Sequence, residues 1–488
     1  MSEYVAVKTT DVQAIAEAIG KKKGEGIYQD DAVPFDHFAQ EIDNLCLTDS
    51  IKNHCEQDTE YDYPPCNADG EPLTTENEII DHIKNRPFFM DAKLKSITLK
   101  NCKSVSGGAF YGCEALESVD MPECTSVENA WNHQPPGTSN TYNYGIFQNC
   151  TKLKTVNMPK LANTGTYMFD GCTSLESINM PDIPYVNTYT FRNCKKLASI
   201  SFQSLNIVYS YAFEGCTSLA TVELPSATSI GSSAFYGCTS LASVDLPSAT
   251  SIGQSAFQNC TSLASVDLPS ATSIDNYAFQ NCTSLATVEL PSATSIGQSA
   301  FSGCTSLTEV AIPMWVTQEG SNGFDQFYNC SKLETIDLPS FDSIYSSNYN
   351  YIFSNCPSLT YLRMRNAVPT NVNNFKYNSN TKNIKIIDYR NATVVPALGN
   401  VSYFPGLSEH NYTTFFIVPS DKLQEWKNAS NWSTLEASHN YIITDEAGYN
   451  DYREQEQYKE YPDLLQTVYR LNNDKIEPII DEEGAIDG

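Results

Sequence analysis

A cysteine that returns every 22 residues constrains the fold of this chain more than any other feature. The regular run comprises Cys150, Cys172, Cys194, Cys216, Cys238, Cys260, Cys282 and Cys304. From Cys216 onward four units are almost copies of one another, as CTSLASVDLPSATSIGQSAFQN illustrates. A unit of this length cannot bury its apolar face alone, so it must stack against its neighbours. The sequence therefore predicts a solenoid.

The apolar positions within one unit indicate how each coil is built. Val244 and Leu246 alternate with polar neighbours, as in a half-buried strand. Pro247 cannot donate a ladder hydrogen bond, so it ends that strand. Ile252 belongs to a second short extended stretch, and Phe257 follows in a tight turn. Because equivalent strands of successive coils pair with one another, we expect parallel sheets.

Phenylalanine occupies one fixed position of the unit along most of the chain. The set comprises Phe110, Phe147, Phe169, Phe191, Phe213, Phe235, Phe257, Phe279, Phe301, Phe327 and Phe353. At strand spacing, about eleven coils give a stack on the order of 50 Å long. We expect the rings and the cysteines to form a buried structural ladder. Its most regular part comprises Phe235, Phe257, Phe279, Cys238, Cys260 and Cys282.

The unit LxxVxLP…I…AFxxC resembles the leucine-rich repeats of the BspA type, which are common in surface and phage-borne proteins of gut and oral microbes. The resemblance covers residues 94–365. The first unit departs slightly, because Lys100 stands where proline is usual. The resemblance implies a mainly β leucine-rich-repeat solenoid of about eleven 22-residue coils and a binding role. It identifies no ligand.

The 16 cysteines allow three interpretations. Equivalent Cβ atoms of adjacent coils would lie about 4.8 Å apart, longer than the roughly 3.8 Å of a disulfide. Unpaired buried thiols are therefore the main prediction, and they fit assembly in a reducing compartment. A metal site would rest on Cys46, His54, Cys55 and Cys66, whose spacing matches no standard zinc site. A nucleophilic cysteine needs a nearby base, and no histidine falls in a regular coil. We expect neither metal nor cofactor.

Charge and missing motifs exclude several classes of function. Lys plus Arg number 30 against 58 for Asp plus Glu, which gives a formal net charge of −28. Such a surface repels phosphate backbones and anionic membranes, so we expect no nucleic-acid partner. No stretch approaches the roughly 20 apolar residues of a membrane span, and the N-terminus lacks a secretory signal pattern. No HExxH, GxSxG or phosphate-loop spacing occurs, so we expect no enzymatic activity.

The chain divides into five predicted segments. These are a helical N-terminal attachment module (1–50), a polar linker (51–93), the solenoid (94–365), an α/β C-terminal cap (366–444) and an acidic tail (445–488). The first segment resembles a module found ahead of such repeats in phage tail and adhesin-type proteins, which implies attachment to a virion component. Shielding of the first coil's apolar end is the alternative role. The run VPSDKLQEWKNASNW resembles an ending that often closes these proteins. The tail is either a solvated extension or an arm that orders against another subunit.

Three longer steps between cysteines mark insertions. The step is 37 residues from Cys113 to Cys150, and 26 from Cys304 to Cys330 and from Cys330 to Cys356. Insertions in a repeat map to loops on one face, so we expect all three at one edge. Their candidate ligand-binding residues are Trp131, His133, Tyr142, Tyr144, Trp315, Phe324, Tyr345, Tyr349 and Tyr351. Exposed rings stack on sugars or anchor a protein partner, and packing of the rings onto their own coils is the alternative.

These features together predict a phage virion protein, a tail or head-fibre component that presents the solenoid for host recognition. The expected partners are other virion proteins, bound through the N-terminal module, and a glycan or protein of the host surface. A homo-oligomer is expected by analogy. The alternative is a bacterial cell-surface adhesin. The missing signal pattern and the unpaired cysteines favour a virion, which assembles in the host cytoplasm.

Overall fold

The repeat positions form short strands in the computed structural model. The structure describes residues 61–62, 88, 90–100, 102–133, 142–180, 183–311, 325–338, 355–364, 385–390, 395, 413–429, 433, 441–459, 470–472 and 475–477. The predicted N-terminal helices therefore lie outside the described residues. The chain forms two units, Met1–Leu219 (unit 1) and Ala220–Gly488 (unit 2). Each is described by itself.

Unit 1 contains a five-stranded parallel sheet with the order β1-β2-β4-β8-β9. Its strands are β1 (Tyr61–Asp62), β2 (Ser96–Thr98), β4 (Ser118–Asp120), β8 (Thr155–Asn157) and β9 (Ser177–Asn179). Shorter parallel pairs are β3 (Ser104–Val105) with β5 (Ser126–Val127), and β10 (Tyr185–Val186) with β12 (Ile207–Val208). Strand β11 is Ser199–Ser201. Because β1 pairs with β2, part of the predicted linker belongs to the sheet.

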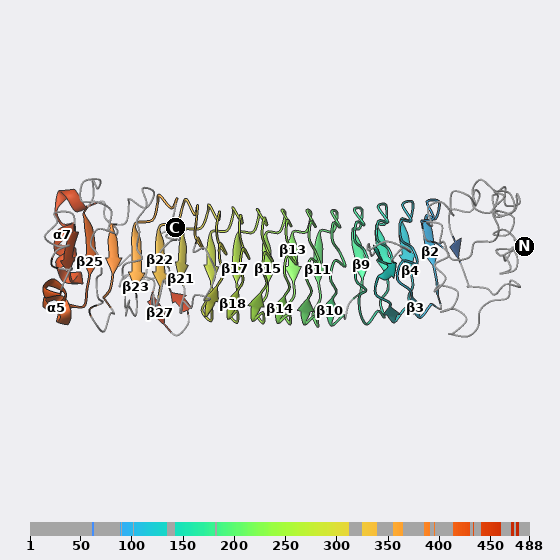
Figure 1. Cartoon of the computed structure of the whole chain (residues 1–488), viewed down its shortest axis with the longest axis horizontal. Coiled ribbons are helices and arrows are strands. Elements are labelled where there is room, and N and C mark those ends of the chain that lie inside the picture. The colour runs from blue at the N-terminus through green and yellow to red at the C-terminus, as the bar shows by residue number, and fades with distance from the viewer. Residues whose placement is uncertain are drawn as a thin grey trace, which may run out of the picture. The chain divides into compact units, whose positions relative to one another are not determined.

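Unit 2 contains a long parallel sheet and a second row of two-residue strands (Figure 1). The long sheet runs through β13 (Thr221–Glu223), β15 (Ser243–Asp245), β17 (Ser265–Asp267), β19 (Thr287–Glu289), β21 (Glu309–Ala311), β22 (Thr335–Leu338), β23 (Tyr361–Met364), β24 (Ile386–Asp388), β25 (Thr414–Ile417) and β26 (Tyr441–Thr444). The second row is β14 (Ser229–Ile230), β16 (Ser251–Ile252), β18 (Ser273–Ile274) and β20 (Ser295–Ile296). A separate antiparallel pair joins β27 (Arg470–Asn472) and β28 (Lys475–Glu477).

The register between neighbouring coils equals one repeat. Val244 of β15 pairs with Val266 of β17, which pairs with Val288 of β19. Equivalent residues therefore stack directly above one another, and the burial of these strands alternates as exposed, buried, exposed. The predicted solenoid of 22-residue coils is confirmed, with about ten turns.

The phenylalanines form a stack of nearly parallel buried rings. Phe257 lies with its centroid 5.2 Å from that of Phe235 and 5.3 Å from that of Phe279, with interplanar angles of 5° and 3°. The turn that holds the ring is also bonded from coil to coil, since the Phe257 amide donates to the Ala278 carbonyl at 2.8 Å. In unit 1 the stack begins one ring earlier than predicted, because Phe88 stacks on Phe110 at 5.2 Å.

The described cysteines are free and buried, as predicted. Thiols of the regular ladder bond back to the preceding coil. The Cys260 Sγ–H donates to the Phe235 carbonyl and that of Cys282 to the Phe257 carbonyl, both at 3.1 Å. Burial raises the pKa of the Cys260 thiol to about 12. These thiols therefore act as satisfied hydrogen-bond donors within the core.

The long sheet of unit 2 continues beyond residue 365 into the predicted cap. The strand and helix expected around Phe415 and Trp426 are present as β25 and as α5 (Leu423–Asn428), which follows the 3-10 turn η3 (Ser420–Lys422). Helix α7 (Glu446–Arg453) and the 3-10 turn η4 (Glu456–Tyr458) come next. Tyr449 of α7 packs edge-on against Phe415, so the start of the predicted acidic tail belongs to the folded end.

Candidate binding surface

The 37-residue step of unit 1 contains a β-hairpin. Strand β6 (Trp131–His133) pairs antiparallel with β7 (Tyr142–Tyr144), so that Trp131 lies opposite Tyr144 and His133 opposite Tyr142. These two strands are called the hairpin below. Four of the predicted binding residues are therefore brought together on one element. The other five, Trp315, Phe324, Tyr345, Tyr349 and Tyr351, lie outside the described residues.

Hydrogen bonds fix the base of the hairpin to the next coil. The Ala130 amide donates to Thr166 Oγ1 at 3.1 Å, and the Thr166 amide donates to Asn129 Oδ1 at 3.4 Å. On the other strand, the Gly145 amide donates to Gln148 Oε1 at 2.8 Å. Side chains thus satisfy the backbone groups that the insertion would otherwise leave unpaired.

Gly145 allows the hairpin to lie close to Tyr167. A Cβ atom at position 145 would lie 2.0 Å from the Tyr167 carbonyl oxygen and 2.9 Å from Tyr167 Cβ. Any side chain at this position would therefore collide with backbone that cannot move away cheaply. The glycine sets the distance between the hairpin and the coil that carries Tyr167.

Three tyrosines at one repeat position stack beside the hairpin. Tyr167 and Tyr189 lie 4.6 Å apart between ring centroids at 17°, and Tyr189 and Tyr211 lie 4.8 Å apart at 13°. We call these three residues the tyrosine ladder. All have left-handed backbone angles, with φ of 57°, 59° and 59°. Such angles are uncommon for bulky residues. The three side chains are partly exposed.

Polar side chains occupy the repeat position that lies three residues after the tyrosine ladder, and they form a row across successive coils. Asp170 accepts two parallel bonds from Arg192, from Nε and from Nη2, both at 2.8 Å, and a third from Gln148 Nε2 at 2.9 Å. Bidentate pairing of this kind fixes the plane of a guanidinium group. The Asp170 side chain is 4% exposed and that of Arg192 31%, so the pair is only partly accessible.

Arg192 also contacts the tyrosine ladder. Its Cζ atom lies 4.6 Å from the ring centroid of Tyr189 and 5.8 Å from that of Tyr167, within the range of cation–π attraction. The hydrogen bonds to Asp170 raise the pKa of Arg192. Burial, followed by the neighbouring tyrosines, raises the pKa of Tyr189, and burial raises the pKa of Glu214. The surface thus combines stacked rings with a guanidinium whose charge is compensated by Asp170.

Two edge-to-face tyrosine pairs occur in the same unit. Tyr144 of the hairpin lies 4.7 Å from Tyr111 at 82°, and Tyr185 lies 6.1 Å from Tyr209 at 81°. Tyr144 therefore packs onto its own solenoid, the alternative considered for the insertion rings. Tyr209 is 41% exposed.

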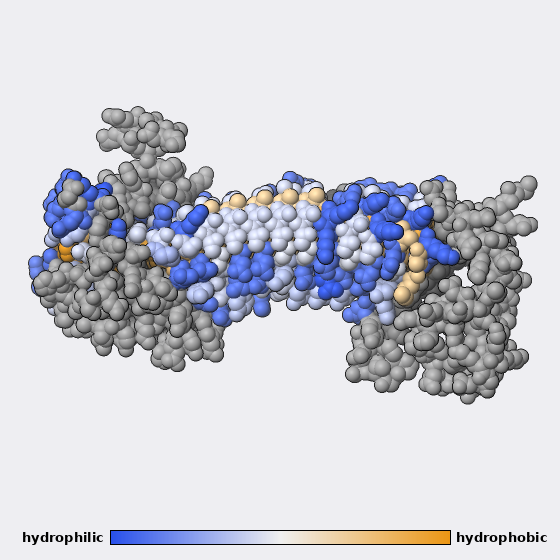
Figure 2. Space-filling view, turned by 90° about the horizontal axis from the view of Figure 1, so that it is seen from above, coloured by the Kyte–Doolittle hydropathy of each residue, from blue (hydrophilic) through white to orange (hydrophobic). Residues whose placement is uncertain are grey.

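The sequence interpretation did not include the tyrosine ladder or Arg192. Their signal was nevertheless present, because the tyrosines follow the 22-residue step and each stands two residues before a repeat phenylalanine. The regular coils of unit 2 have serine there in Ser233, Ser255 and Ser299, with Tyr277 as an isolated exception. Figure 2 shows a largely pale surface of intermediate hydropathy over the middle coils. We interpret the regular coils as a spacer.

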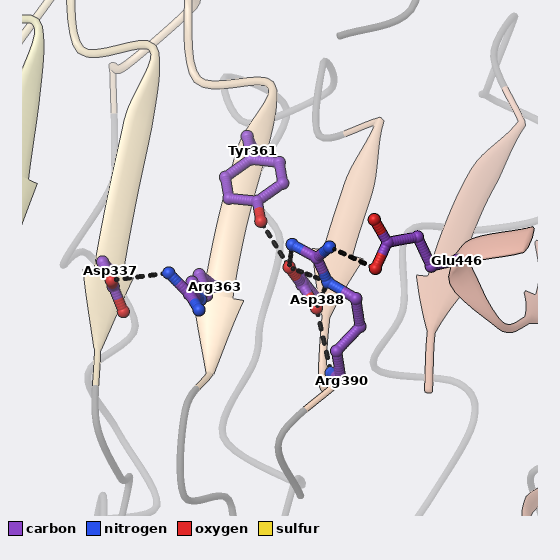
Figure 3. A network of polar contacts seen from close by, with 6 residues as sticks. All are labelled: Asp337, Tyr361, Arg363, Asp388, Arg390 and Glu446. Atoms are coloured by element: carbon purple, nitrogen blue, oxygen red, sulfur yellow. Dashed lines mark hydrogen bonds and ion pairs between the residues drawn. The ribbon is translucent and has the colours of Figure 1, made fainter. Parts of the chain in front are cut away.

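A second polar cluster, near the end of unit 2, is fully paired (Figure 3). Buried Asp388 accepts hydrogen bonds from the Tyr361 hydroxyl and from the Arg390 guanidinium. Arg390 Nη1 reaches Glu446 of α7 at 2.8 Å and so ties the helix to β24. Arg363 lies 3.5 Å from Asp337. Because each charge has an opposite partner, this cluster is a structural link that holds the end of the sheet.

The described residues contain no group of three or more His, Cys, Asp or Glu side chains arranged to hold a metal ion. Within the same residues, no helix has the length and apolar character needed to cross a bilayer.

Comparison of the sequence with known protein families agrees with the repeated coils of the structure. The family described as BspA type leucine rich repeat region matches residues 72–135, 132–229, 206–326 and 323–395. The chain belongs to this family. BspA-type proteins are typically found on bacterial cell surfaces. Leucine-rich repeats of this type are typically non-catalytic scaffolds.

Several solved structures of leucine-rich-repeat proteins are similar to this BspA-type chain. A leucine-rich cell surface protein of Faecalibacterium prausnitzii A2-165 is 24% identical, with 55% of this chain and 86% of that one covered, at a TM-score of 0.30. A leucine-rich repeat protein of Bacteroides ovatus ATCC 8483 is 22% identical, with 64% and 85% covered, at a TM-score of 0.34. No curated protein sequence matches the chain.

Proposed function

We propose that this BspA-type chain is a non-catalytic adhesion protein whose unit 1 contacts a cell surface through the hairpin and the tyrosine ladder. The observation that carries the proposal is their junction at Gly145, where the hairpin meets Tyr167, the first of three stacked tyrosines. Tyrosine and tryptophan provide rigid contact area at low entropy cost, which is typical of binding surfaces. The regular coils offer mainly serine, threonine and alanine and serve as the spacer.

We propose a phage virion as the carrier, with attachment through residues 1–50 and assembly as a homo-oligomer. Buried thiols that donate hydrogen bonds support folding in a reducing cytoplasm. Truncation of residues 1–45 should leave the solenoid folded and abolish incorporation into virions. Incorporation at the full-length level would contradict the assigned role of this segment.

A bacterial cell surface is the second candidate carrier, favoured by the usual location of BspA-type proteins. Fractionation of the producing cells distinguishes the two carriers. Peptides of this chain in purified particles support the virion, and peptides released by shaving intact cells with protease support the cell surface.

The adhesion proposal is tested by removing the hairpin and keeping the coil. Replacing residues 128–144 by Gly-Gln, the residues at 253–254, keeps Gly145 and restores a 22-residue step. Fluorescently labelled full-length protein is incubated with a panel of gut and oral bacterial strains and with epithelial cells. We expect the replacement to weaken binding at least tenfold, or about 1.4 kcal/mol, because it removes the aromatic strands.

The control variant is Gln254→Ala, which changes an exposed residue of a regular coil and should bind as the unchanged protein does. Thermal unfolding measured by circular dichroism should be similar for all three proteins. If the hairpin variant keeps its fold and binds cells with full strength, unit 1 does not contact the cell surface through the hairpin.

A further inference from the structure

We infer that the tyrosine ladder binds a neutral surface glycan, with one sugar ring stacked on the outer face of Tyr167. This inference rests on the proposed adhesion function and names the class of ligand. Tyr189 has a ring on each side, whereas Tyr167 has Tyr189 as its only stacked ring among the described residues. The stack of described rings therefore ends at Tyr167.

The stack ends next to Gly145, which directly follows the hairpin. The preceding coil has Gly145 at the ladder position, so that coil contributes no ring to the stack. Tyrosine faces bind the apolar C–H face of a pyranose, and stacking on an aromatic face is a common mode of sugar recognition. A ligand ring on Tyr167 would continue the stack where the chain supplies none.

The coil itself does not require the three rings. Ser233, Ser255 and Ser299 take the same left-handed conformation at the equivalent position, with φ of 53°, 55° and 51°. Serine is thus sufficient for the fold, and three successive tyrosines need another explanation. Ligand binding explains both their number and their position beside the hairpin.

Hydrogen-bond donors for sugar hydroxyls lie beside the rings. The hydroxyl groups of Tyr167, Tyr189 and Tyr211 form no hydrogen bond with other described residues, and neither does Nη1 of Arg192. The bidentate bond to Asp170 holds this guanidinium in place, so its unused N–H groups keep a fixed direction. A planar hydrogen-bonding fork beside the last ring of the stack suits the hydroxyl-rich edge of a sugar ring.

Charge selects a neutral glycan over a sialylated or sulfated one. Asp170 compensates the charge of Arg192, and the Glu214 carboxylate adds a negative charge in the same row. The whole chain carries −28, which repels anionic sugars at long range. A neutral sugar ring can therefore bind without leaving any charge unpaired.

The test uses the full-length protein and an immobilised panel of neutral, sialylated and sulfated oligosaccharides. We expect binding to a subset of the neutral members. Tyr167→Ser should weaken that binding at least tenfold, since serine is tolerated at this position and only the ring is lost. Tyr277→Ser is the matched control, because it makes the same change at the same repeat position, between Ser255 and Ser299. It should bind with unchanged strength.

If the Tyr167→Ser variant is unstable, Tyr167→Phe provides a second variant that keeps the ring. It should retain most of the binding, because stacking persists without the hydroxyl. Equal binding by the unchanged protein and Tyr167→Ser, or binding confined to anionic members, overturns the inference. Cell binding without binding to any neutral glycan also overturns it and points to a protein receptor, while the adhesion proposal stands. Failure to bind any cell refutes the adhesion proposal itself.

Discussion

Replacing Phe257 by alanine tests whether the phenylalanine stack stabilises the solenoid. The ring is fully buried and contacts Phe235 and Phe279 on its two faces at centroid distances of 5.2 and 5.3 Å. Loss of a buried phenylalanine costs about 3–5 kcal/mol, because transfer and cavity terms add. Within that sum, the two ring contacts contribute about 0.5–1.5 kcal/mol each.

The change in unfolding free energy is measured by guanidinium chloride titration with circular dichroism as the signal. Phe257→Leu keeps most of the apolar volume and loses both ring contacts, so we expect a cost of about 1–3 kcal/mol. Gln254→Ala, an exposed change in the same coil, should lie within about 0.5 kcal/mol of the unchanged protein.

Repeat arrays can lose structure locally, so hydrogen exchange followed by mass spectrometry accompanies the titration. We expect faster exchange in the coils next to Phe257 if part of the array opens before the rest. A loss below about 1 kcal/mol together with unchanged exchange would refute the reasoning, because a buried ring cannot be removed at so small a cost.

Four further predictions concern the thiols, the charges and the cap. Alkylation without reduction should modify Cys260 and Cys282 only after denaturation, and a coil-to-coil disulfide found by mass spectrometry would contradict the free thiols. Burial raises the pKa of Cys260 and Cys304 to about 12 from 9.0. The free energy of unfolding should therefore be highest below pH 9 and fall as the pH rises toward 12, and a Tm that does not change over this range would refute the effect. Glu223, Asp245, Asp267 and Glu289 stack in register, so raising NaCl from about 0.01 M to 1 M should raise Tm by screening their repulsion, and a lower Tm would show that another interaction dominates. Asp388→Asn leaves Arg390 without its buried partner and should cost about 3–5 kcal/mol in denaturant unfolding. Lys422→Ala breaks a partly exposed ion pair of 3.8 Å and should cost under about 1 kcal/mol.

Most of the solenoid could be predicted because every coil repeats the same pattern of strands and turns. Val244 and Ile252 specify two strands, and the 22-residue step specifies that each strand pairs with its own copy. The stack begins at Phe88, which also stands 22 residues before Phe110. It was missed because no cysteine follows Phe88 at the repeat spacing, so the unit did not match the pattern.

The candidate site was only partly predictable. A 37-residue step shows that residues are inserted after Val127, yet it does not specify antiparallel pairing of Trp131 with Tyr144. The bond between Arg192 and Asp170 joins residues 22 apart. Such pairs become neighbours only when coils stack, so local sequence patterns do not reveal them.

The in-register pairing of near-identical coils has a consequence for how this protein can change through evolution. Each regular coil contributes one ring, one thiol donor and one carbonyl acceptor, and the next coil needs the same set. Deleting or duplicating 22 residues between Cys216 and Cys304 would therefore leave every contact type intact and change the length of unit 2 by about 4.8 Å. Unequal recombination between the repeated coding segments produces such changes in one step. The reach of unit 2 can thus be adjusted by whole coils, with no new interaction required in the core.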